Sequence, residues 1–109
     1  MQNTRLKALS KMLLNVADQI KLTLNVTPLI GISHKMRPLG IPADTITIDC
    51  LKSNKRILIV LHDQQPHTVN YQYMFVGKDP NNEFVQVDNE NFSEEGLFSI
   101  IANYLYKDL

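Results

Sequence analysis

The chain has 109 residues, 44% hydrophobic and 20% charged, a composition typical of one folded domain and unlike that of a disordered chain. Its single cysteine excludes an internal disulfide framework, and the lack of about 18 consecutive apolar residues argues against a membrane-spanning helix. We therefore expect a cytoplasmic protein that is neither exported by the common secretory route nor inserted in a membrane.

The net charge is zero, but the two halves of the chain carry opposite charges. Residues 1–56 hold nine Lys or Arg and three acids, and residues 57–109 hold two Lys and eight acids, so the halves carry +6 and −6. This polarity favours pairing within the chain or between two copies, because a nucleic-acid-binding domain usually has a net positive charge. The alternative is a basic surface for nucleic acid, formed by Arg5, Lys7, Lys11, Lys21, Lys35 and Arg37.

The first predicted element is an amphipathic helix over about residues 4–24. Its apolar residues are spaced by three and four positions, at Leu6, Leu9, Leu13, Val16 and Ile20, and Leu24 closes the series. Pro28 discourages further extension of the helix. The apolar stripe has the width of a surface that packs on a core, which we favour over a membrane-surface helix.

Residues 25–43 form a connector that three prolines and two glycines interrupt. A structureless loop of this length is uncommon, so we expect a packed connector with one helical turn or a short strand near residues 30–36. It gathers three potentially cationic side chains, those of His34, Lys35 and Arg37. Because the glycine-rich phosphate-loop pattern is missing, we interpret this loop as a solvated rim rather than an anion site.

Four strands are predicted next, over about residues 45–51, 56–62, 68–76 and 83–87, as an antiparallel meander. A tight turn at Ser53-Asn54 pairs Lys52 with Lys55, and the shared apolar face pairs Leu61 with Val69. A type I turn at 79–82 then pairs Phe75 with Val85 and Tyr73 with Val87. This register places twelve residues on one face: Ile46, Ile48, Cys50, Ile57, Ile59, Leu61, Val69, Tyr71, Tyr73, Phe75, Val85 and Val87.

A second amphipathic helix is predicted over about residues 93–106, with Ser93 as its N-cap. Its apolar stripe consists of Leu97, Ile100, Ile101, Tyr104 and Leu105. The complete prediction is a single α+β domain of residues 1–109. In it, a four-stranded antiparallel β-meander is packed on one face by the N- and C-terminal amphipathic helices, giving two layers.

The segment 62–67 contains two histidines and an aspartate, which suit a metal site or general-base chemistry. The register argues against a metal, because it sends His62 to the opposite face from His67 and pairs Asp63 with His67 as a local polar contact. We interpret Cys50 as a buried structural thiol, since its expected neighbours are aliphatic. No catalytic residue, metal ligand or cofactor is predicted.

The aromatic residues Tyr71, Tyr73 and Phe75 alternate along one strand, as in sheets that stack RNA bases. The matching RNA-binding motif is absent, and aromatics at this spacing opposite an apolar hairpin are more often part of a core. We therefore predict that all three belong to the core.

The second strand is apolar on both faces, with Leu58 and Val60 opposite the main apolar face. Two helices on one face leave Leu58 and Val60 to be covered by the connector or by another molecule. This favours a non-enzymatic protein-binding or regulatory module, which forms a homodimer or binds another protein. Its expected partner surface consists of this second sheet face, with Leu58 and Val60, and the basic residues Arg5, Lys7, Lys11, Lys21, Lys35 and Arg37. The alternatives are nucleic-acid binding through the basic N-terminal half and a small enzyme that uses His34, His62 or His67 with a carboxylate.

Overall fold

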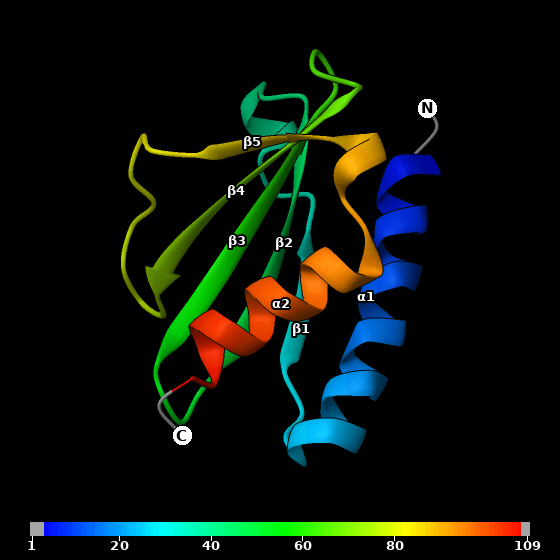
Figure 1. Cartoon of the computed structure of the whole chain (residues 1–109). Helices are drawn as coiled ribbons and strands as arrows, with labels where there is room; N and C mark the ends of the chain where they lie inside the picture. The colour runs from blue at the N-terminus through cyan, green and yellow to red at the C-terminus, as the bar shows by residue number, and fades with distance from the viewer. Residues whose placement is uncertain (1–3, 108–109) are drawn as a thin grey trace.

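The computed structural model describes residues 4–107 and shows an α+β protein in which two helices lie on one face of a five-stranded sheet (Figure 1). The two-layer α+β class is the predicted one. The predicted strand number, four, is wrong by one, because the connector contains an additional strand. No helix in the described part of the chain has the length and apolar character needed to cross a membrane.

The helices form where the apolar spacing predicts them. Helix α1 spans Thr4–Leu24 and buries the first five residues of its predicted stripe, whereas the sixth, Leu24, is 41% exposed. Helix α2 spans Glu94–Leu105, and the backbone N–H of Gly96 donates to the Ser93 hydroxyl at 3.1 Å, which confirms the N-cap. The buried stripe of α2 consists of Leu97, Ile101 and Leu105.

The additional strand is β1, Leu29–Ser33, which pairs antiparallel with β2, Ala43–Cys50. A short 3₁₀ turn, η1, follows at Arg37–Leu39, and Gly40 ends it in the left-handed conformation with φ 89°. The connector is therefore packed, as expected, and contains both a strand and a helical turn. Strand β1 is five residues long with Gly31 at its centre, so its sequence signal is weak.

The remaining strands are β3 (Lys55–His62), β4 (Thr68–Phe75) and β5 (Val85–Asp88), and the sheet order is β1-β2-β3-β4-β5 with all pairs antiparallel. The predicted register of β3 with β4 is confirmed, since the ladder that pairs Val60 with Asn70 is the one that aligns Leu61 with Val69. A second 3₁₀ turn, η2, follows β5 at Asn89–Asn91.

Two other predicted registers are wrong. Between β2 and β3, Cys50 pairs with Lys55, so residues 51–54 form the loop and the ladder is shifted by two residues. Between β4 and β5, Val69 pairs with Val87, a shift of four residues. Both shifts are even, so each side chain keeps its predicted face. The physical reason is loop length: longer loops replace the tight turns that were predicted, and they form their own contacts.

The loop 76–84 between β4 and β5 covers part of the sheet face opposite the helices. The Gln72 side chain donates from Nε2 to the Asn81 carbonyl at 3.1 Å, and the Asn81 N–H donates back to Gln72 Oε1 at 3.1 Å. A cavity of about 250 Å³ is lined by Val60, Asn70 and Phe84 on this side. Leu58 is therefore only 8% exposed and Val60 is half-buried.

The core lies between the sheet and the helices. It contains the stripes of both helices and the central positions of β2 and β3, where Ile46, Ile48, Ile57 and Ile59 are almost fully buried. The two helices contact each other, and α2 contacts β2 and β3. Strands β4 and β5 are therefore less well covered on the helix side, which leads to the exposed surface described below.

Candidate functional site

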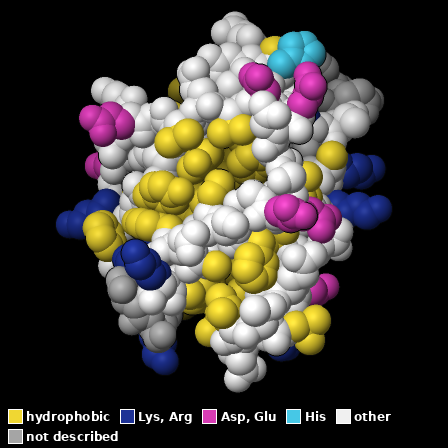
Figure 2. Space-filling model, in the orientation of Figure 1, with side chains coloured by type: hydrophobic (Ala, Val, Ile, Leu, Met, Phe, Trp, Pro, Cys, Tyr) yellow, Lys and Arg dark blue, Asp and Glu magenta, His cyan; other side chains and the backbone are white. Residues whose placement is uncertain are grey.

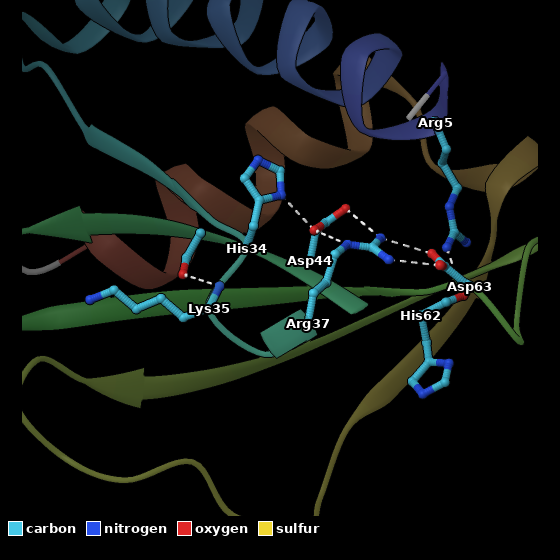
Figure 3. A network of polar contacts seen from close by, with 8 residues as sticks. Arg5, His34, Lys35, Arg37, Asp44, His62 and Asp63 are labelled. Atoms are coloured by element: carbon cyan, nitrogen blue, oxygen red, sulfur yellow. Dashed lines mark hydrogen bonds and ion pairs between the residues drawn. The ribbon is translucent and has the colours of Figure 1, made fainter. Parts of the chain in front are cut away.

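The connector is attached to the sheet by a polar cluster, the connector network, formed by His34, Arg37, Asp44 and Asp63 (Figure 3). Arg37 is the first residue of η1, and its side chain points between the two carboxylates. Its Nε and Nη2 donate to the two oxygens of Asp44, both at 2.8 Å, and its Nη1 and Nη2 donate to those of Asp63 at 2.8 and 2.9 Å. One guanidinium thus binds the start of β2 and the turn after β3 with paired, charge-assisted bonds.

Asp44 is the buried member of the connector network, with 2% of its surface exposed. Hydrogen bonds from Arg37 lower the pKa of Asp44 to about 2, a direction that the His34 contact supports and burial opposes. Arg37 also lowers the pKa of Asp63, and the two carboxylates together raise the pKa of Arg37. Arg37, Asp44 and Asp63 are therefore charged at neutral pH.

Arg5 binds the same end of the sheet from α1. Its guanidinium donates to the backbone carbonyls of His62, Gln65 and Thr68 at 2.7 to 2.8 Å, so it closes the turn between β3 and β4. Burial lowers the pKa of Arg5, and Asp63 and Asp44 oppose that shift. With Arg37, Asp44 and Asp63 it forms a cluster of two cations and two anions, which is electrically balanced.

The contact between His34 and Asp44 resembles a general-base pair, because His34 Nδ1 lies 2.6 Å from Asp44 Oδ1 and the imidazole is more than half exposed. Since a carboxylate only accepts, Nδ1 is the donor. A nucleophile is also required for covalent chemistry, and the neighbouring Ser33 hydroxyl instead accepts the Lys35 backbone N–H at 3.2 Å. We therefore interpret the pair as part of the attachment of the connector.

The basic residues singled out from the sequence do not form one patch. Arg5 and Arg37 bind internal partners, as described above. Lys7, Lys11 and Lys21 are exposed on α1, and Lys35 is exposed after β1. Two of the six cations are thus part of the fold, and nucleic-acid binding through the other four stays a prediction.

The two histidines near the β3–β4 turn are not brought together as a metal site. The His62 Nδ1 accepts the Gln64 backbone N–H at 3.1 Å, and the predicted contact of Asp63 with His67 is replaced by the ion pair with Arg37. Within residues 4–107, no group of three or more His, Cys, Asp or Glu side chains is placed to hold a metal ion. Cys50 is a free thiol, buried as predicted.

One exposed apolar surface is rich in aromatic side chains, and we define this aromatic face by Tyr73, Phe75, Val85 and Tyr104. The first three are 42%, 50% and 45% exposed. Figure 2 shows hydrophobic side chains gathered over the sheet, on the upper-left side of α2. The prediction that Tyr73 and Phe75 belong to the core is therefore wrong, whereas that for Tyr71, which is buried, is confirmed.

The aromatic face is ordered by its own contacts. The ring centroids of Tyr73 and Tyr104 lie 4.5 Å apart, and the Lys55 ammonium lies 5.2 Å from the Tyr104 ring centroid. The Tyr104 hydroxyl donates to the Met74 carbonyl at 2.8 Å, which links α2 to β4. Burial raises the pKa of Tyr73 to about 12, so its hydroxyl is neutral at physiological pH. The surface is preorganised, uncharged and rich in aromatic side chains.

Sequence reasoning missed this face because the period-two pattern predicts on which side of the sheet a residue lies. It does not predict whether a helix covers that residue. One signal was present: the predicted stripes of two helices are too narrow to cover every strand of a wide sheet. Comparison with known proteins adds no assignment, since no family model, curated protein or solved structure gives a significant match to the chain.

Proposed function

We propose that the chain is a non-enzymatic protein-binding module that forms a homodimer through the aromatic face. The observation that carries the proposal is the exposure of Tyr73, Phe75 and Val85 on the neighbouring strands β4 and β5, over the sheet where Figure 2 shows hydrophobic side chains gathered. Aromatic side chains are enriched in protein interfaces, and large exposed apolar patches commonly mark such interfaces. The sequence placed the partner surface at Leu58 and Val60, but the burial of Leu58 favours the opposite side of the sheet.

The charges around the aromatic face support a second copy of the chain as the occupant. Lys55 pairs with Phe75 at one end of β4, and the Lys78 N–H donates to the Phe75 carbonyl at 3.2 Å. Asp88 pairs with Thr68 at the other end of β4, with Glu90 just beyond it. A two-fold axis that lies in the interface and runs perpendicular to β4 brings the basic end of one copy onto the acidic end of the other, which is the self-complementarity that a closed dimer needs.

The proposal is tested by measuring the mass in solution as a function of concentration, by light scattering or sedimentation. The chain of 12.5 kDa should behave as a particle of about twice that mass. Phe75→Ser should weaken dimerisation about thirtyfold or more, because aromatic residues at the centre of an interface contribute most of its energy. Leu22→Ser is the matched control, since Leu22 is exposed on α1, and it should leave the dimer intact.

A charge reversal sharpens the test. Lys78→Glu should weaken the dimer about fivefold, and the second change Glu90→Lys should restore it. A wild-type protein that is a monomer at about 1 mM would refute the dimer. A dimer that Phe75→Ser leaves unchanged would place the interface elsewhere and contradict the proposal equally.

A further inference from the structure

The two edges of the sheet are protected differently. Strand β5 has four residues and ends in Asp88, and Glu83 lies two residues before it. Acidic side chains at the edge of a sheet discourage pairing with another chain. Strand β1 has neither charge nor proline among its five residues, and Leu29 and Ile32 are 49% and 48% exposed. Within the described part of the chain, β1 has a neighbouring strand on one side only. Figure 1 shows it as the outermost strand, beside α1.

The open edge of β1 offers backbone groups to a further strand. In an antiparallel pair, every second residue turns its N–H and C=O away from its partner strand. The residues of β1 between Leu29 and Ser33 therefore present unpaired donors and acceptors in an extended row. Such a row binds a peptide by strand addition, in which backbone hydrogen bonds give affinity and neighbouring pockets give specificity.

A cavity of about 310 Å³ lies at the beginning of this edge. It is lined mainly by apolar groups, including those of Val26, Leu29, Leu51 and Tyr106. A cavity of this size and lining is suited to one or two apolar side chains of a bound peptide. Because Leu29 both begins β1 and lines the cavity, a strand added to this edge can place a side chain there.

Charge distinguishes between possible occupants of the edge. Lys52 lines the cavity, and Lys35 follows β1 by two residues, so exposed lysines flank both ends of the strand. Five strand residues span about 17 Å, which sets the separation of the two lysines along the edge. Asp49 on β2 lies opposite Leu29 in the strand register. Its carboxylate accepts hydrogen bonds from Arg56 at 2.7 and 2.8 Å.

We propose that the β1 edge binds an extended segment of another protein, which carries an apolar side chain for the cavity and acidic residues for Lys35 and Lys52. A second copy of β1 fits less well, because antiparallel pairing around Gly31 brings Lys35 of one copy toward Lys52 of the other. The edge is separate from the aromatic face, so peptide binding does not depend on the proposed dimer.

The test uses a fluorescent peptide, acetyl-Glu-Val-Leu-Val-Thr-Glu-amide, and fluorescence anisotropy at low salt. We expect a Kd of about 100 µM, together with changes in the NMR signals of the β1 amides and their protection from hydrogen exchange. Two variants of the peptide leave the protein untouched. Methylation of both valine nitrogens removes backbone donors, and replacement of Glu by Lys inverts the charge. Each should weaken binding at least tenfold.

Protein variants then locate the site. Lys35→Glu and Lys52→Glu should each weaken binding about fivefold, whereas Lys11→Glu, on the exposed side of α1, should have no effect. Phe75→Ser should also bind the peptide normally, so failure of the dimer and failure of this site are distinguishable. Equal binding of the N-methylated peptide, NMR changes confined to another surface, or contacts between β1 strands of two copies would each overturn the proposal.

Discussion

The connector network and the aromatic face lie at different parts of the sheet and differ in whether their side chains have partners within the chain. In the network, each charged side chain of Arg37, Asp44 and Asp63 has a partner within the chain. On the aromatic face, Tyr73 and Phe75 contact the chain with one side and leave the other exposed. The difference separates structure from function: a group whose partners lie within the fold stabilises it, and an ordered apolar group without cover is available to a partner.

The network resembles a catalytic site more than the aromatic face does, because it contains a histidine, buried charge and a perturbed pKa. Such features cluster at functional sites, but structural ion-pair networks produce them as well. Here the guanidinium of Arg37 binds both carboxylates in a bidentate geometry. Its Nε, Nη1 and Nη2 donors are therefore engaged by acceptors within the chain. The comparison predicts large stability effects in the network and small ones on the aromatic face.

The largest expected effect comes from Asp44→Ala. The variant removes the acceptors of Arg37 and His34 at a buried position, so the free energy of unfolding should fall by about 3 kcal/mol. Asp49→Ala is the matched control, because Asp49 pairs with Arg56 at a more exposed site and should lose about 1 kcal/mol or less. Urea denaturation measures both. Equal losses would contradict the assignment of Asp44 as the central acceptor of the network.

A smaller effect is expected from pH. The pKa of Asp44 is lowered from 3.8 to about 2 in the folded state, so its carboxylate stabilises the fold above pH 4, and this contribution is lost as the pH falls toward 2. The difference in unfolding free energy between the wild type and Asp44→Asn should be about 2 kcal/mol above pH 4 and should vanish below the folded pKa.

The pH prediction is checked by urea denaturation of both proteins at a series of acidic pH values. Other carboxylates titrate in both proteins, so the difference between the two curves reports the Asp44 charge together with its effect on the pKa of Asp63. Asp63, whose pKa Arg37 also lowers, is present in both. A difference that stays constant from pH 5 to pH 2 would show that the loss in Asp44→Asn comes from packing and not from charge.

Much of the fold could be predicted because its signals are local. The stripe of α1, the cap at Ser93 and the alternation of β3 and β4 each depend on residues close in sequence. The two wrong registers share a cause, since residues 51–54 and 76–84 form longer loops than the tight turns that Ser53 and Asp79 suggest. Even shifts conserve the apolar face, so hydrophobic pattern alone does not choose between them.

The sites could be predicted less well because they depend on topology. Asp63 lies 26 residues from Arg37, and no local pattern links the two side chains. Strand β1 was hidden by Gly31 and by its short length, and without it the unprotected edge could not be recognised. The exposure of Phe75 follows from how the two helices cover the sheet, a tertiary property that a period-two pattern does not contain.

The smallest expected effect tests the hydrogen bond that links the Tyr104 hydroxyl to β4. Tyr104→Phe removes the hydroxyl that donates to the Met74 carbonyl at 2.8 Å but retains the ring that packs on Tyr73. A single neutral hydrogen bond contributes about 1 kcal/mol, so the loss of unfolding free energy should be about a third of that in Asp44→Ala. Because the ring remains, the dimer mass at a given concentration should be unchanged. If Tyr104→Phe instead destabilised the protein as strongly as Asp44→Ala, the aromatic face would be part of the structural framework, and its exposure would no longer argue for a partner.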